Sequence, residues 1–263
     1  MAKKILAFAN RKGGSGKTTS AVNVAARLAE LASGRVLLVD IDPQGNAAEA
    51  LGVEANGRCL SKMLTGQADL RDVILPAGDS RPNLFVVPAS DRLRNATTQL
   101  VAMEVASRFG GNAGYSIDTV LADVFAPYVH LFEYIVVDCP PTIGLLDNAL
   151  YNWATDVIVP VKMAYLDTSG ARKNLEDILA ARGNGAKIRI AHVLPTFYRP
   201  REVVAKETFD QLREAYGRLV ALPIPQTTLI EQSQAVGQRT IFEYAPDSPA
   251  AMAYDNLVRR IMA

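Results

Sequence analysis

The feature that most constrains this chain is a glycine-rich segment near its start, residues 12–19, Lys-Gly-Gly-Ser-Gly-Lys-Thr-Thr. An apolar run over 5–9 precedes it, and an alanine-rich helical run follows it from Val22. The order is strand, glycine loop, helix, which is the context in which G-x-x-x-x-G-K-[ST] builds a phosphate site. Glycines let successive backbone N–H groups point inward at phosphates, and the helix N-terminus adds partial positive charge.

The same segment predicts how a nucleotide is held. Lys17 can reach the β- and γ-phosphates, and the Thr18 hydroxyl can bind Mg²⁺. We expect ATP to be contacted by Gly13, Gly14, Ser15, Gly16, Lys17, Thr18 and Thr19. A tight turn without a ligand is the alternative, and the flanking strand and Lys-Thr-Thr helix start argue against it.

Lys12 is unusual, because an ordinary loop of this type needs only Lys17. A lysine at the start of the loop cannot easily bend back to its own nucleotide, but it could reach that of a facing subunit. The alternative is a solvated lysine at a strand end. Lys-Gly-Gly-x-Gly-Lys-Thr-Thr resembles the deviant Walker A motif of the ParA/MinD/NifH class. The resemblance implies an ATP-sandwich homodimer, with Lys12 crossing the interface as a catalytic group.

Two later segments end in carboxylates. Residues 39–46 read Val-Asp-Ile-Asp-Pro-Gln-Gly-Asn and resemble the D-x-D-P-Q-G motif of ParA proteins. That resemblance implies that Asp42 orients or activates the attacking water and that Asp40 lies nearer the Mg²⁺ shell. For both residues, capping of the next helix is the alternative. Residues 134–141, Tyr-Ile-Val-Val-Asp-Cys-Pro-Pro, have the form of a Walker B strand, in which Asp138 holds a Mg²⁺-bound water or Thr18.

The region around residue 225 is expected to line the base of the nucleotide. In the ParA class, an Ile-Pro loop after the last strand lines the adenine, and the resemblance transfers this role to Pro225. Thr196 is a further candidate for the same pocket.

Strand-like and helix-like runs alternate along the chain, which is typical of a parallel sheet with helices on both faces. We expect strands near 3–9, 35–40, 84–88, 133–138, 155–161, 188–194 and 219–223. We expect helices near 17–32, 44–51, 58–65, 90–107, 116–129, 144–152, 166–182, 202–216, 227–236 and 247–262. With 263 residues and no long linker, the prediction is a single doubly wound α/β domain of the P-loop NTPase type, without an N-terminal helix-turn-helix domain.

Composition excludes several classes of protein. No apolar run approaches the ~18 residues of a membrane span, and no signal-peptide pattern is present, so we expect a cytoplasmic protein. Cys59 and Cys139 are far apart, which disfavours a disulfide and a structural zinc site. Cys59 falls in a polar helical stretch and Cys139 at the Walker B strand end, and neither position matches the cluster cysteines of NifH-type reductases. His130 and His192 stand among apolar residues and are expected to be packing residues rather than ligands. The net charge of +1 excludes a strongly basic nucleic-acid-binding protein, but not a local basic patch.

A segment near residue 200 contains the residues that bear on whether the protein binds DNA. Residues 196–202, Thr-Phe-Tyr-Arg-Pro-Arg-Glu, are similar to the T-M-Y-D-x-R segment of ParA proteins, so Arg201 matches the arginine that the family uses on DNA. The following basic residues, Lys206, Arg213 and Arg218, are candidates for the same surface, and a solvated helix face is the alternative. The two arginines that usually follow Ile-Pro in chromosomal ParA proteins are missing, so Arg199, Arg239 or Arg259 are open as replacements.

These features together predict a ParA-like, Mg²⁺-dependent ATPase. The resemblance implies an ATP-bound homodimer on nonspecific DNA, hence nucleoid-associated, and a ParB-like or cargo-adaptor protein that stimulates hydrolysis so that DNA or another cargo is positioned or partitioned. A MinD-like spatial regulator and an ATP-dependent metabolic enzyme of the same fold are the alternatives. Stable membrane association is not expected, since no residues remain after the last predicted helix for a membrane-binding tail.

Overall fold

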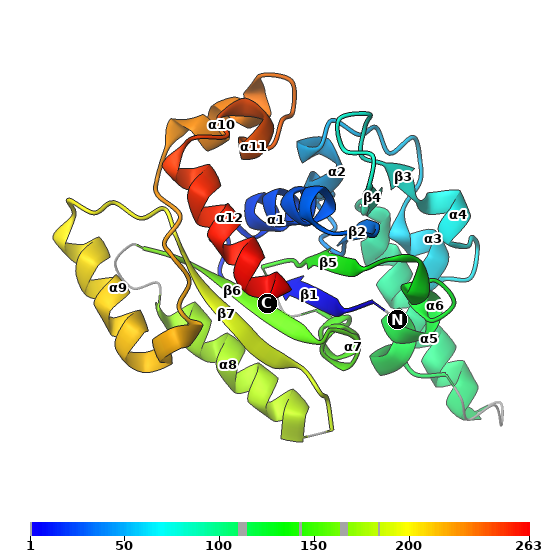
Figure 1. Ribbon diagram of the computed structural model, residues 1–263. Coiled ribbons are helices and arrows are strands. Elements are labelled where there is room, and N and C mark those ends of the chain that lie inside the picture. Colours follow the sequence, from blue (N-terminus) through cyan, green and yellow to red (C-terminus); the bar gives the residue numbers. More distant parts are fainter. Residues whose placement is uncertain (1, 110–114, 142–143, 164–167, 184) are drawn as a thin grey trace.

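Seven strands form one sheet in the order β3-β4-β2-β5-β1-β6-β7 within the described part of the chain (Figure 1). The computed structural model describes residues 2–109, 115–141, 144–163, 168–183 and 185–263, but not the side chains of 168–175. The strands are β1 (Lys4–Phe8), β2 (Val36–Asp40), β3 (Leu75–Pro76), β4 (Leu84–Val87), β5 (Tyr134–Asp138), β6 (Asp156–Lys162) and β7 (Arg189–Thr196). Adjacent strands run parallel, except that β3 is antiparallel to β4.

Helices cover both faces of this sheet, so the predicted α/β class is confirmed. They are α1 (Lys17–Leu31), α2 (Asn46–Ala50), α3 (Leu60–Leu64), α4 (Leu70–Val73), α5 (Arg92–Phe109), α6 (Val120–Phe125), α7 (Asp147–Trp153), α8 (Thr168–Gly183), α9 (Val203–Tyr216), α10 (Thr228–Ala235), α11 (Ile241–Tyr244) and α12 (Pro249–Met262). Three 3₁₀ turns are η1 (Ile117–Thr119), η2 (Val129–Leu131) and η3 (Gly217–Leu219). In Figure 1, α1 and α12 lie on one face of the sheet, and α7 and α8 lie on the other.

The alternation of side chains along β1 explains why the sheet is covered twice. Leu6 and Phe8 enter the apolar cluster beneath α1 and α12, whereas Ile5 and Ala7 enter the cluster on the opposite face. Successive strand residues point to opposite faces, so a strand buried on both sides must be apolar throughout. The central position of β1 therefore places the loop that follows it at the middle of the sheet's carboxyl edge.

The strand predicted over 219–223 is wrong. Val220 makes only an isolated bridge to Val193, after which Ala221 N donates to Val193 O (2.9 Å) and Ile224 N to Pro195 O (2.8 Å). The segment follows the edge of β7, but Pro223 has no N–H to continue a ladder.

The single helix predicted over 116–129 is also wrong. The structure has η1, α6 and η2 in its place, with a break around Pro127. A proline inside a helix removes an N–H and clashes with the carbonyl of the residue four positions earlier, so α6 ends at Phe125. The short elements β3, α4 and α11 were not predicted.

The structure also bears on the expectations about membrane spans and about the two cysteines. In the part of the chain that the structure describes, no helix is long and apolar enough to cross a membrane. Cys59 and Cys139 are both buried and unoxidised, and Cys139 packs among apolar core residues.

Candidate functional site

The glycine loop connects β1 to α1 at the carboxyl edge of the sheet. Gly14 (φ +68°) and Gly16 (φ +82°) adopt the left-handed conformation that other residues rarely take. A side chain at residue 16 would also stand 3.4 Å from the ring of Phe197. The first turn of α1 has neither a side-chain cap nor an acidic residue, so its N–H groups keep the charge that favours an anion.

Lys17 lies inside this loop rather than in solvent. It is 7% exposed, and its Nζ donates to the carbonyl of Lys12 (3.1 Å). Burial lowers the pKa of Lys17, while the charge of Asp138 acts in the opposite direction. The neighbouring Ser15 has a buried hydroxyl without a partner among the described residues, and its carbonyl accepts from Thr196 Oγ1 (2.9 Å).

The carboxylates of Asp40 and Asp138 lie close to each other because β2 and β5 are neighbours, and the charge of Asp138 acts on Lys17. Asp40 and Asp138 are directly paired across the two strands. Asp40 Oδ1 accepts from Asp42 N (2.8 Å), and Oδ2 accepts from Ala47 N (3.0 Å). Each oxygen of Asp40 therefore accepts one backbone N–H and helps to shape the loop that carries Asp42, while its place near the Mg²⁺ shell stays a prediction.

Asp42 is held on that loop by its own backbone contacts. It is 8% exposed, its Oδ1 accepts from Gln44 N (3.0 Å), and its carbonyl accepts from Gly45 N (2.9 Å). Ile41 N donates to Asp138 O (3.0 Å), which ties the loop to the end of β5. Asp42 thus lies on a short, well-anchored turn at the carboxyl edge.

Burial disfavours the charged forms of the carboxylates at this edge. It raises the pKa of Asp40 to about 7, against the stabilising N–H groups of Ala47 and Asp42. Burial, followed by the charge of Asp40, raises the pKa of Asp138 well above its ordinary range. Adjacent buried carboxylates of this kind ionise readily only when a cation is added to the site.

Asp138 fits the requirements of a magnesium site. Both of its oxygens are buried without a hydrogen-bond partner of normal geometry among the described residues. The Thr18 hydroxyl is near enough to favour the charged carboxylate. No three His, Cys, Asp or Glu side chains within the described ranges gather into a set that could hold a metal alone. Mg²⁺ usually takes one or two carboxylates, with water and substrate phosphates completing its shell, so the residues present suit it.

A pocket of ≈220 Å³ opens next to the loop. Its lining includes Gly16 from the loop and Thr19 from α1. Thr196 at the end of β7 also lines it, with Phe197 and Pro225 from the segments that follow. The remaining lining residues are Ile224, Gln226, Thr227, Ile230, Glu231 and Tyr254. The structure therefore brings Pro225 and Thr196 together beside the phosphate loop; Phe197 was not among the predicted residues.

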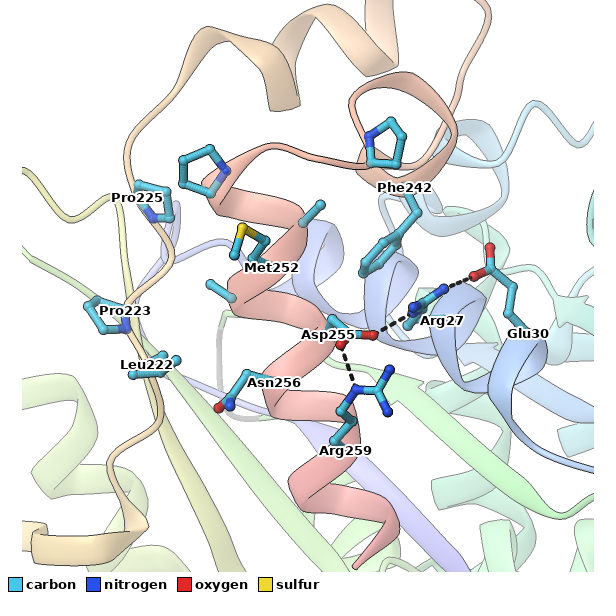
Figure 2. A pocket seen from close by; sticks show the side chains of 14 residues that line it. Arg27, Glu30, Leu222, Pro223, Pro225, Phe242, Met252, Asp255, Asn256 and Arg259 are labelled. Atoms are coloured by element: carbon cyan, nitrogen blue, oxygen red, sulfur yellow. Dashed lines mark hydrogen bonds and ion pairs between the residues drawn. The ribbon is translucent and has the colours of Figure 1, made fainter.

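A larger hollow of ≈910 Å³ lies on the other side of Pro225, between α12 and the 222–225 segment (Figure 2). Its walls include Met252 and Phe242, and none of its lining comes from the phosphate loop. Figure 2 also shows Asp255 joining two arginines, with Arg27 Nε at 2.8 Å and Arg259 Nε at 2.7 Å. Because it is separated from the loop, this hollow is a poor candidate for the nucleotide, and the smaller pocket is the better one.

Lys12 has an exposed side chain on a firmly held backbone. Its N–H donates to Asn10 Oδ1 (3.0 Å), and Asn10 Nδ2 donates to Pro160 O in β6 (2.6 Å). The guanidinium of Arg11 is ion-paired to Asp177 of α8. Asn10 and Arg11 were missed from the sequence, because their partners lie 150 and 166 residues away.

The four basic residues predicted to bind DNA are exposed, but they do not form one compact cluster. Arg201 precedes α9, Lys206 and Arg213 lie on it, and Arg218 lies beyond it on η3. Since α9 has 14 residues, each rising about 1.5 Å, Arg201 and Arg218 are separated by about 20 Å of helix. The four residues follow the length of α9 as a line.

Comparison with known sequences gives the chain's relatives. The family model described as an AAA domain matches residues 3–189. The chromosome-partitioning ATPase Soj of Thermus thermophilus is 34% identical over 262 residues, covering 98% of this chain and 95% of that protein. The sporulation initiation inhibitor protein Soj of Bacillus subtilis is 31% identical over 264 residues, covering 99% and 98%.

Comparison with solved structures gives the same fold. The apo structure of McdA from Cyanothece has a TM-score of 0.83 at 22% identity and covers 99% of both chains. Cobyrinic acid a,c-diamide synthase from Mycobacterium smegmatis, solved with an ATP analog and magnesium, has a TM-score of 0.78 at 26% identity, covering 98% of this chain and 94% of that one.

Proposed function

The chain belongs to the Soj/ParA family of chromosome-partitioning ATPases, and we propose that it is a Mg²⁺-dependent ATPase working as a DNA-associated switch. In this proposal two subunits enclose ATP in a sandwich dimer that binds DNA without sequence preference. A partner protein of the ParB or cargo-adaptor type stimulates hydrolysis and releases the dimer, which positions DNA or another cargo. The protein acts in the cytoplasm and associates with the nucleoid while ATP is bound.

The observation that carries the proposal is the pairing of an uncapped helix N-terminus with Asp138, a buried carboxylate that has no hydrogen bond of normal geometry among the described residues. One of these groups favours phosphate and the other favours a cation, so together they favour a phosphate–magnesium complex. The adjoining pocket at Pro225 offers apolar walls for a base. The crystal structure of cobyrinic acid a,c-diamide synthase from Mycobacterium smegmatis, which contains an ATP analog and magnesium, supports ATP and Mg²⁺ as the ligands proposed here.

Each residue of the site has a role in this proposal. The backbone of 13–19 and Lys17 would hold the phosphates, while Thr18 and Asp138 would hold the magnesium ion. Bound Mg²⁺ supplies positive charge that offsets the charge developing on the phosphates during transfer to water. Asp40 fixes the loop of Asp42 through the backbone N–H groups of residues 42 and 47. Asp42 then orients the attacking water, and Lys12 reaches the phosphates of the partner subunit.

DNA binding in this proposal uses the line of basic residues along α9. Arg201, Lys206, Arg213 and Arg218 are exposed on each subunit, and a dimer offers two such lines. Doubling the number of phosphates neutralised steepens the dependence of binding on salt in proportion. Since phosphate contacts carry no base information, all DNA sequences should bind alike.

The test compares three nucleotide states in one assay. Sedimentation velocity and gel shifts with random-sequence DNA are run with ATP, with ADP and without nucleotide. We expect a dimer and a DNA complex with ATP only, trapped when Asp42→Ala slows hydrolysis by orders of magnitude. Arg201→Glu should weaken binding to all sequences, whereas Arg108→Glu, at an exposed arginine on α5, should have little effect. Equal DNA binding in all three states, or none in any, would contradict the proposal and favour a MinD-like or metabolic ATPase.

A further inference from the structure

Arg11, the residue immediately before Lys12, is fixed to a distant helix. Its Nε donates to Asp177 Oδ2 (2.5 Å), and a second guanidinium nitrogen donates to Asp177 Oδ1. This is the two-pronged geometry in which arginine binds a carboxylate most strongly. The two side chains are only 29% and 25% exposed, so water screens the pair less than it screens a surface pair such as Arg199 with Glu202 (50% and 48%).

The backbone of Lys12 is held by Asn10 on its N–H and by Lys17 on its carbonyl, and a nucleotide would compete only for Lys17. Asn10 holds the Lys12 N–H, and its amide is in turn bonded to β6. The Lys12 carbonyl is held by Lys17 Nζ, the same ammonium that the phosphates would attract. A nucleotide would compete for that ammonium. Asn10 and the ion pair of Arg11 with Asp177 hold the start of the loop without involving Lys17.

The ion pair also extends to a second helix. Asp147, in the first turn of α7, is close enough to Arg11 and Asp177 to sense both charges. Burial raises the pKa of Asp147 to about 6, with Asp177 adding to the rise and Arg11 opposing it. The guanidinium of Arg11 thus pairs with Asp177 and also acts on the charge of Asp147, so the segment before Lys12 is joined to α8 and lies within electrostatic range of α7.

We propose that the Arg11–Asp177 pair positions Lys12 for its contact with the facing subunit. The inference rests on the proposed ATP-sandwich dimer. The pair touches neither the phosphate-binding N–H groups nor Asp138, so it is a positioning device rather than a catalytic one. Removing it should weaken dimerisation and dimer-dependent hydrolysis, and it should leave the binding of nucleotide to a single subunit unchanged.

The experiment measures these two quantities separately. Dimerisation is followed by sedimentation velocity with AMPPNP and Mg²⁺, and monomer binding by the fluorescence of a labelled ADP at low protein concentration. For Arg11→Gln and for Asp177→Asn we expect the dimer dissociation constant to rise about tenfold, with the affinity for ADP within about twofold of the parent. The double variant should be no weaker than either single variant, since both remove the same pair.

Control variants separate positioning from general loss of structure. Arg108→Gln makes the same replacement at an exposed i,i+4 pair with Glu104 on α5 and should dimerise normally. The exchanged pair Arg11→Asp with Asp177→Arg should recover part of the lost dimerisation, which a merely damaged loop would not. A parent protein that fails to dimerise with AMPPNP would overturn the proposed function itself. If the parent dimerises and the Arg11→Gln variant dimerises with the same dissociation constant, only the role of this ion pair would be overturned.

Discussion

Gly45 gives the sharpest test of how the loop of Asp42 is built. It precedes α2 with φ +71°, and a Cβ at this position would lie 2.6 Å from the carbonyl oxygen of Ala89. Real Cβ atoms do not approach backbone oxygens so closely, so Gly45→Ala must displace either the loop or the Ala89 backbone. Gly57 is a matched control, because it has φ +75° but nothing within 4 Å of an added Cβ.

Both substitutions place alanine in the left-handed backbone region, but only the one at Gly45 also creates a steric clash. Placing alanine in the left-handed region costs about 1 kcal/mol after the reduced freedom of the unfolded chain is counted. The clash at Gly45 should add about 2 kcal/mol, as overpacking does elsewhere in well-packed regions. We therefore expect the free energy of unfolding to fall by about 3 kcal/mol for Gly45→Ala and about 1 kcal/mol for Gly57→Ala.

Urea unfolding followed by circular dichroism measures both losses, provided the slope with denaturant is unchanged. Gly45→Ala should also slow ATP hydrolysis more than it weakens ATP binding, because the displaced loop carries Asp42 and not the phosphate-binding N–H groups. Equal losses of stability in the two variants would refute the reasoning, since they would show that the Ala89 backbone yields at no cost.

Three further outcomes can be checked singly. Lys17→Ala should reduce ATP affinity at least about 100-fold by calorimetry, because a lysine bound to phosphate makes strong charge-assisted contacts; unchanged affinity would contradict the loop assignment. Thr196→Val keeps the volume but removes the bond to Ser15 O, so urea unfolding should show a loss of about 1 kcal/mol, and no loss would contradict its anchoring role. His192 has its pKa lowered to about 4 from the ordinary 6.5, chiefly by burial and then by the charge of Arg260. The unfolded chain therefore binds more protons between these values, and stability should fall by about 2 kcal/mol as pH drops from 6.5 to 4. His192→Gln should lack this part of the fall, and identical pH profiles would refute the argument.

The phosphate loop and the Walker B strand could be predicted because each is encoded in a few adjacent residues. Asp138 ends an apolar run and Lys17 follows the glycine loop after another, and the ends of such buried strands converge at one edge. The alternation of strands and helices predicted a parallel sheet, but not the order of its strands. A short sequence pattern was sufficient to predict those features that depend on residues adjacent in the sequence.

The remainder depends on contacts that no local pattern encodes. Arg11 and Asn10 are ordinary residues until the fold brings Asp177 and Pro160 beside them. Asp40 could be a metal ligand or a loop anchor on its sequence alone, and only the fold shows the backbone N–H groups that it anchors.

The segment that follows η3, in place of the expected strand, determines how readily the edge of the sheet can pair with another chain. Residues 220–226 exchange backbone hydrogen bonds with β7 and its extension, including Tyr198 N to Ile224 O (3.0 Å) and Gln226 N to Tyr198 O (3.0 Å). They occupy the margin of β7, yet Pro223 and Pro225 prevent them from offering a regular row of N–H groups to another chain. At the opposite margin, β3 is only two residues long and ends at Pro76. Both borders of the sheet are thus poor templates for strand addition, which disfavours association of copies of this chain through their sheet edges.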